Sequence, residues 1–359
     1  MTISRRLDNL PHTTLILASG YADSMPPRSP VEQQIADLQR LSAEGAASAV
    51  IEGLTRALKH QSNLMVAKAA ELCSERHAKG LLDAREMLPH LLAAWSRMFE
   101  NAAKTDPQCW AKNALIRALT ALGGQESAPF LRGVRYQQWE ATWGGQVDTA
   151  ITVRGGCALA LLQSTDLPRL EIAQHLVITL TDEKTPVRID GARALEALGG
   201  DEASLLLRLK ARISDPEPQV LGQVFESLLG LEGDRAIPFL AEFLDAREEA
   251  VADEAALALG ASRSTQALQA LRKAWERHRA RRLGAVLLRA ISALRIPEAV
   301  DFLADIVRTE GKMDALDALD ALALHGATGE IAQAARRAAS QRVEESIVGR
   351  VASLFPPGR

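Results

Sequence analysis

The chain of 359 residues is 47% hydrophobic but only 4% aromatic, and its formal net charge is −3. So small a net charge gives no general attraction to nucleic acid or to an anionic membrane. Abundant Ala, Leu, Glu and Arg favour helices with a core of small side chains. The apolar run at residues 15–18 is too short for a signal peptide, and no later run approaches a membrane span, so we expect a cytoplasmic protein without membrane contact.

The N-terminal part differs from the rest of the chain. Residues 1–30 contain several prolines and no helical period, which predicts an extended or mobile arm. Residues 31–104 have apolar residues at helical spacing and predict degenerate repeat helices, with either a helical pair or one broken helix up to His60. The spacing before the next repeat is long, so we expect longer helices or an extra turn around Lys79 and Gly80.

A phrase of four positions then recurs about every 31 to 34 residues through most of the chain. It consists of an apolar anchor, an apolar residue or Ala five positions later, a small residue at seven and Leu at eight, as in Val187, Ala192, Ala194 and Leu195. The anchors fall at positions 111, 153, 187, 220, 251, 283 and 314. A period of this length indicates a solenoid, in which each helical hairpin buries its apolar face against its neighbours.

The borders of the repeat helices are marked by particular residues. An Asp lies five residues before several anchors, where its side chain can cap the helix that follows: Asp106, Asp148, Asp182 and Asp215. Glycines mark the ends, up to Gly326. No segment alternates with period two over a useful length, so no strands are expected.

Residues 182–200 resemble the second helix of a HEAT repeat, and the short period resembles the HEAT-like repeats of phycobilin lyases. The resemblance covers residues 105–326 and implies an all-α fold of the armadillo type. The chain is thus expected to form a right-handed α-solenoid of about eight HEAT-like hairpins, with the second helices on the concave face. Residues 327–359 are expected to form capping helices with polar outer faces.

The resemblance also implies a role for two arginines. Arg154 and Arg188 match the basic residue that meets an Asp of a neighbouring unit in such repeats. Leu221, Ala252 and Gly284 stand at the equivalent positions and depart from the pattern. We therefore expect a partial Asp–Arg ladder that is structural.

The irregular unit between anchors 111 and 153 carries an insertion at residues 132–148. It concentrates Tyr136, Trp139 and Trp143 beside Arg135 and a Gly-Gly pair, in a chain with only five Trp and two Tyr. Trp, Tyr and Arg dominate binding hot spots, so the insertion is a candidate partner site. The alternative is that the two Trp rings fill a gap between longer helices as core plugs.

Charged residues on the second helices complete the candidate partner site. Arg117, Asp190 and Arg193 are expected beside the insertion, and Glu226, Asp253 and Glu254 form an acidic stripe over two repeats. A basic run follows at residues 272–289. It can bind phosphates, or it can be a solvated surface that stabilises helix ends.

Motifs for catalysis and metal binding are lacking in the sequence. There is no nucleophile elbow, phosphate loop, zinc-protease motif or dinucleotide fingerprint, and the seven His residues are scattered. The three cysteines are expected to be buried free thiols. We therefore expect no catalytic residues, no metal and no cofactor. Some HEAT-like arrays are bilin lyases or alkylpurine DNA glycosylases, and the resemblance keeps such an enzyme as an alternative.

Together these patterns predict a scaffold or adaptor that binds an unidentified protein partner on its concave face and on the 132–148 insertion. The leading alternative is a nucleic-acid-binding solenoid that uses residues 272–289.

Overall fold

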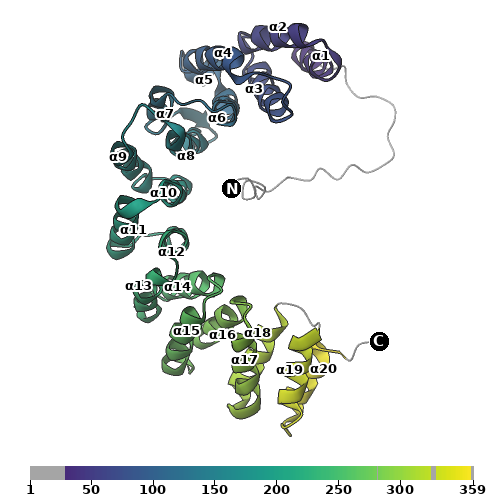
Figure 1. Ribbon diagram of the computed structural model, residues 1–359, viewed down its shortest axis with the longest axis vertical. Helices are drawn as coiled ribbons and strands as arrows, with labels where there is room; N and C mark the ends of the chain where they lie inside the picture. The colour runs from purple at the N-terminus through teal and green to yellow at the C-terminus, as the bar shows by residue number, and fades with distance from the viewer. Residues whose placement is uncertain (1–28, 281, 325–328, 357–359) are drawn as a thin grey trace.

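The chain folds into a C-shaped array of helical pairs (Figure 1). The computed structural model describes residues 29–280, 282–324 and 329–356. The helices of the N-terminal half are α1 (Pro30–Glu44), α2 (Ala47–Leu58), α3 (Asn63–Ala78), α4 (Ala84–Arg97), α5 (Ala102–Thr105), α6 (Trp110–Ala121), α7 (Ser127–Gly133), α8 (Ile151–Ala160), α9 (Arg169–Leu180) and α10 (Thr185–Leu198). Those of the C-terminal half are α11 (Gly200–Ile213), α12 (Pro218–Glu232), α13 (Ile237–Ala241), α14 (Glu249–Ala261), α15 (Thr265–His278), α16 (Arg282–Ala293), α17 (Pro297–Thr309), α18 (Lys312–Ala323), α19 (Gly329–Ala339) and α20 (Glu345–Leu354). Short 3-10 turns lie at Pro107–Cys109, Leu161–Gln163, Gly233–Ala236 and Glu242–Asp245.

The helices form an inner and an outer layer. Helices α6, α8, α10, α12, α14, α16 and α18 line the hollow of the C, and each packs against the next (Figure 1). Their hairpin partners α4, α7, α9, α11, α13, α15 and α17 lie outside them. The inner helices carry the repeated phrase, so the expected α-solenoid with second helices on the concave side is confirmed.

The repeated phrase forms the core between the layers. Val187, Ala192, Ala194 and Leu195 are fully buried, and the same positions of the next repeat are buried as well. Small residues at these positions let the helices approach closely. At Gly191 in α10, a Cβ atom would lie 2.7 Å from the backbone nitrogen of Leu180 in α9, closer than real side chains come.

The Asp residues before the helices act as the sequence predicts. Asp106 accepts hydrogen bonds from the backbone N–H groups of Ala111 and Lys112 at 2.8 and 2.9 Å. Asp182 and Asp215 each accept one from the backbone two residues later. These contacts satisfy amides that the first helical turn leaves free.

Buried ion pairs link successive repeats through the same carboxylates. Arg154 lies 2.7 Å from Asp148 and also donates to Asp182 of the next repeat at 3.2 Å. Arg188 pairs in turn with Asp215 at 2.8 Å. The expected partial Asp–Arg ladder is therefore present, and it ends where an apolar residue replaces Arg.

The expectation of a chain without strands is wrong at the insertion. Residues 139–148 form an antiparallel hairpin of β1 (Trp139–Thr142) and β2 (Gly145–Asp148), with Thr142 paired to Gly145 across the turn. Gly144 adopts φ 101°, a conformation that suits glycine in a tight turn. The strands have four residues each, too few to produce a visible period of two in the sequence.

Helices outside the repeated units lie at the two ends of the array. Helices α1 and α2 settle the open choice up to residue 60 as a helical pair. The long spacing before anchor 111 is filled by α5 and a 3-10 turn after α4, while a turn also lies at Lys79 and Gly80. The expected arm lies outside the described residues except for Ser29 and Pro30, which begin α1, and Gly326 is also outside them. Helices α19 and α20 lie at the C-terminal end, as expected for caps.

Candidate functional site

The hairpin is anchored at its base by buried charged and polar groups. Asp148, at the end of β2, accepts from the backbone N–H of Gln138 and of Ala150 and pairs with Arg154. Burial alone raises the pKa of Asp148, but these hydrogen bonds and the guanidinium of Arg154 bring it below its ordinary value. Arg154 also donates to the backbone carbonyl of Tyr136 at 2.9 Å. The same ion-pair ladder that joins the repeats thus holds the hairpin in place.

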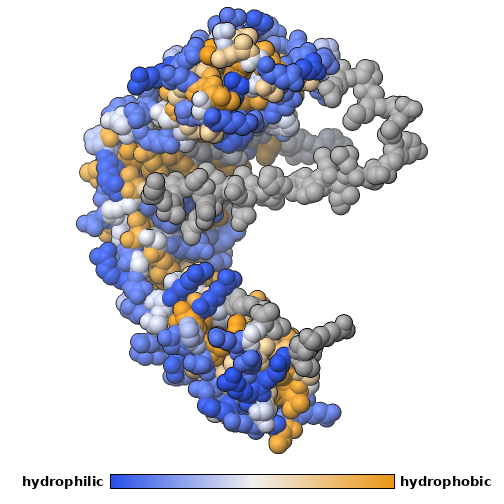
Figure 2. Space-filling model, turned by 45° about the vertical axis from the view of Figure 1, so that its right-hand side comes forward, coloured by the Kyte–Doolittle hydropathy of each residue, from blue (hydrophilic) through white to orange (hydrophobic). Residues whose placement is uncertain are grey.

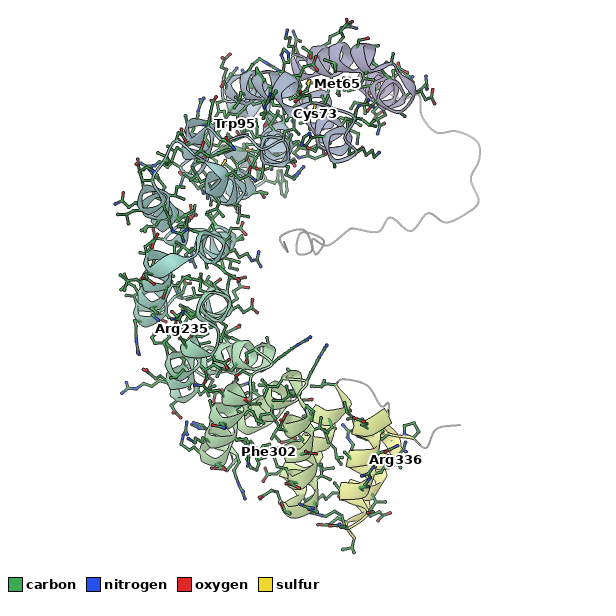
Figure 3. The ribbon with its side chains drawn as sticks, viewed as in Figure 1. Met65, Cys73, Trp95, Arg235, Phe302 and Arg336 are labelled. Atoms are coloured by element: carbon green, nitrogen blue, oxygen red, sulfur yellow. The ribbon has the colours of Figure 1, made fainter. Side chains whose placement is uncertain are left out.

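A buried lysine and an aromatic cluster lie beneath the hairpin. The Nζ atom of Lys112 is fully buried, 3.2 Å from Asp106, 3.0 Å from Gln138 Oε1, and over the rings of Phe99 and Tyr136. Phe99 stacks edge-on between Tyr136 and Trp95, which Figure 3 labels. Burial raises the pKa of Tyr136 to about 12, so its hydroxyl stays protonated and donates to Gln138. Tyr136 is therefore part of the hairpin's support.

Glu140 of β1 ties the hairpin to the start of α6. Its Oε1 atom accepts hydrogen bonds from Gln138 Nε2, Thr149 Oγ1 and the backbone N–H of Gln108, each at 2.7 Å. Burial alone raises the pKa of Glu140, but these hydrogen bonds lower it below its ordinary value. Gln108 and Cys109 both have positive φ, so this attachment fixes a strained turn.

The two tryptophans of the hairpin are exposed. Trp143, in the turn, is fully exposed, and Trp139 is 46% exposed with its ring 5.7 Å from Lys184 Nζ at the start of α10. Trp110, at the start of α6, is 52% exposed. The interpretation of Trp139 and Trp143 as core plugs is therefore wrong, and Tyr136 takes that role instead. Arg135 is also exposed, just before the hairpin.

The predicted site residues on the inner helices make polar contacts with residues outside the hairpin. Arg117 of α6 is exposed and reaches Glu71 of α3 at 4.0 Å. Arg193 of α10 is 55% exposed and contacts Asp190 at 3.4 Å and Gln223 of α12 at 2.8 Å. In the described part of the chain, no hydrogen bond, ion pair or ring contact joins these residues to Trp139 or Trp143.

The residues of the predicted acidic stripe lie on α12 and α14. One of them forms an ion pair with a residue of α16. Glu226 is exposed, and Glu254 lies against Gly222 of α12, where an added Cβ would meet its carboxylate at 2.2 Å. Burial raises the pKa of Glu254, and the charges of Glu226 and Asp253 raise it further. Asp253 is bonded to Arg282 at 2.8 Å.

Part of the basic run at 272–289 is neutralised by carboxylates of adjacent repeats. Arg277 and His278 contact Asp245, Arg279 contacts Glu310, and Arg282 contacts Glu249 and Asp253, all within 3 Å. Arg272 lies over the ring of Phe302, which Figure 3 labels. Arg281 lies outside the described residues. These contacts favour the structural interpretation of the run.

Two surface features were not anticipated from the sequence. Trp110 lies directly before anchor 111. Because the chain has only five Trp residues, its presence there was the sequence feature that could have indicated a surface site. Leu205, Leu209 and Ile213 form an exposed stripe along the outer helix α11, with a spacing of four that is visible in the sequence. Lys184 reaches Trp139 only through the fold, so no sequence pattern indicates their contact.

A family model described as HEAT repeats matches residues 206–291. Residues 206–291 of this solenoid are HEAT repeats. Comparison with curated proteins gives no match. Among solved structures, this chain is similar to an engineered protein with 17% identity and a TM-score of 0.40, over 93% of this chain and 97% of that one. It is also similar to human deoxyhypusine hydroxylase in complex with glycerol, with 21% identity and a TM-score of 0.27, over 74% of this chain and 89% of that one. At these TM-scores neither likeness bears on function.

Two kinds of feature are absent from the described part of the chain. None of its helices combines the length and apolar character needed to cross a membrane. Within residues 29–280, 282–324 and 329–356, no three His, Cys, Asp or Glu side chains are grouped as metal ligands would be.

Proposed function

We propose that this chain is a protein-binding scaffold whose main recognition element is the 139–148 hairpin, with the concave face as a second contact surface. The observation that carries the proposal is a pair of exposed tryptophans on a rigidly anchored projection. Large aromatic side chains on a rigid base bury much area with little loss of rotamer freedom, as binding hot spots require. The proposal includes no catalytic step.

The polarity of the two surfaces supports this division of roles. Aromatic residues make up only 4% of the chain, so exposed tryptophan rings are unusual in this molecule. Figure 2 shows a visible surface on which hydrophilic residues surround several hydrophobic patches. The concave residues Arg117, Arg193 and Glu226 are exposed charges, which add specificity more than affinity. A partner held by the tryptophans would then be oriented by these charges.

The nucleic-acid alternative receives less support. Nucleic-acid binding depends on cations that are free to neutralise phosphates, which releases the counterions of the nucleic acid. Arg277, Arg279 and Arg282 already contact carboxylates. An enzyme of the lyase or glycosylase type has no particular group of residues in its favour.

The test is capture of proteins from the cell lysate of the source organism by immobilised chain. Trp139→Ala with Trp143→Ala should abolish capture of the specific partner and leave the melting temperature nearly unchanged, because Trp143 is fully exposed and Trp139 is about half exposed. The matched control is Leu205→Ala with Leu209→Ala, which removes a similar exposed apolar pair from α11 and should leave capture intact. Retention of the partner by the tryptophan variant, together with its loss from the leucine variant, would overturn the proposal.

A second arm tests the alternative. Arg279→Glu with Arg282→Glu should not change capture of the protein partner. Duplex DNA binding of micromolar or tighter affinity by the wild type at physiological salt, lost in this variant, would favour the nucleic-acid function instead.

A further inference from the structure

The hairpin has a free edge of backbone hydrogen-bonding groups. Thr142 and Gly145 flank a two-residue turn, and the backbone N–H of Thr149 donates to the carbonyl of Gln138 at 2.8 Å. In an antiparallel ladder hydrogen-bonded pairs alternate with pairs that are not bonded to each other. Trp139 and Ala141 therefore belong to the second kind, and their N–H and C=O groups point away from β2.

These groups of β1 are not used elsewhere in the described part of the chain. No hydrogen bond within residues 29–280, 282–324 and 329–356 involves the backbone N–H or C=O of Trp139 or Ala141. Both residues are exposed. An uncovered edge of this kind is a template for pairing with another strand.

The two edges of the hairpin are not equivalent. On β2 the outward-pointing residues are Gln146 and Asp148, and Asp148 is buried at the base beside Arg154. A strand that adds to β2 would thus find one accessible residue, whereas β1 offers two. The edge of β1 is the better site for strand addition.

The charges beside β1 indicate what kind of strand fits. Lys184 lies next to the ring of Trp139, and Arg135 precedes β1 in an exposed position. Neither side chain has a carboxylate within ion-pair distance in the described part of the chain. Glu140 is the acidic residue of β1, and its Oε1 atom already accepts three hydrogen bonds. An incoming strand with acidic side chains would complement the two free cations.

We propose that an extended, acidic segment of a partner protein adds to the edge of β1 as a third strand. Backbone hydrogen bonds to Trp139 and Ala141 give affinity, and alternate side chains of the added strand meet Trp139 and Lys184. This proposal rests on the proposed function, because it takes the hairpin as the partner site and names the mode of binding and the chemistry of the partner.

Two proline variants test strand addition at the two edges separately. Ala141→Pro removes the outward N–H of β1 without removing a hydrogen bond to β2, a position where proline is tolerated in edge strands. Gln146→Pro makes the same change at the residue paired with Ala141, on the other edge. The two variants therefore disturb the hairpin to a similar degree and differ in the edge they block.

The probe is a phage-displayed library of random dodecapeptides, panned against the full chain. We expect enriched peptides with acidic residues at alternate positions, which bind Ala141→Pro about tenfold more weakly than wild type and Gln146→Pro as tightly as wild type. Lys184→Gln should also weaken them, and bound peptide should slow amide hydrogen exchange at Ala141 but leave Glu140 unchanged.

Other outcomes overturn the proposal. These are a failure to enrich any peptide, equal binding to both proline variants, and enrichment of basic peptides. A dimer of the chain that Ala141→Pro dissociates would assign the edge to a second copy instead. If Trp139→Ala with Trp143→Ala abolishes capture of the lysate partner while Ala141→Pro does not, strand addition is wrong and the proposed function stands. If capture survives all of these changes, both are wrong.

Discussion

Loss of Arg154 tests most clearly whether the buried Asp–Arg ladder contributes to the stability of the fold. The guanidinium of Arg154 is 2% exposed and contacts Asp148, Asp182 and the carbonyl of Tyr136. Arg154→Leu would leave two carboxylates without their partner, and breaking a buried ion pair in this way costs about 3–5 kcal/mol. Since whole domains are stable by only about 5–15 kcal/mol, we expect the repeats from α7 to α10 to unfold well before the others.

The assay is urea denaturation followed by circular dichroism, together with hydrogen exchange resolved along the chain. The variant should show a lowered first transition and fast exchange in the hairpin and in α8. The matched control is Arg193→Leu, which removes the exposed ion pair with Asp190. We expect it to lower the free energy of unfolding by about 0–1 kcal/mol. Equal midpoints for Arg154→Leu and the wild type would refute the reasoning.

The pH dependence of this effect has a defined sign. In the folded wild type the pKa of Asp148 is lowered. The ionised Asp148 therefore stabilises the fold at pH values above the pKa of an Asp in the unfolded chain, about 3.9. This stabilisation is lost as the pH falls through the lower pKa of the folded state. Arg154→Leu removes one cause of that lowering. The stability difference between the two proteins should therefore be largest near neutral pH and shrink in acid.

Three further predictions concern the core, the acidic stripe and the basic run. Leu195→Asp buries an unpaired charge between repeats and should lower the free energy of unfolding by several kcal/mol; a native-like thermal melt would contradict the placement of this residue. Glu254→Gln should raise the urea midpoint at pH 7, because burial raises the folded pKa of Glu254 and its ionised form destabilises the fold; the gain should vanish below about pH 4, where the carboxyl is protonated in both states, and a gain that persists there would exclude this cause. Arg279→Glu with Arg282→Glu breaks only exposed pairs, so the circular dichroism spectrum should be unchanged and the melting temperature should fall by a few degrees at most; loss of helical signal would show that the pairs are essential.

The repeat architecture could be predicted because the same sequence pattern occurs in each unit. Anchors such as Val187 and Val220 recur at nearly constant spacing, and Asp182 and Asp215 mark the start of the helix each time. The hairpin could not be predicted, because its strands are short and it is held by tertiary contacts such as that between Arg154 and Tyr136.

The candidate site was only partly readable from the sequence. The rarity of Trp139 and Trp143 identified the insertion, but whether the rings face solvent or core depends on Phe99 and Tyr136 packing together beneath them. The neutralisation of the basic run was readable in principle, since each pair joins residues about one repeat apart, as with Arg277 and Asp245. Such pairs are missed when the charges of each helix are considered separately, because the two partners belong to neighbouring repeats.

Site-specific photo-crosslinking in the source organism tests the central claim most directly. A photoreactive phenylalanine analogue placed at Trp143 should give one discrete adduct with a protein partner, and the same analogue at Leu205 on the outer helix α11 should give none. An adduct from position 205 with none from position 143 would contradict the claim that the hairpin is the recognition element.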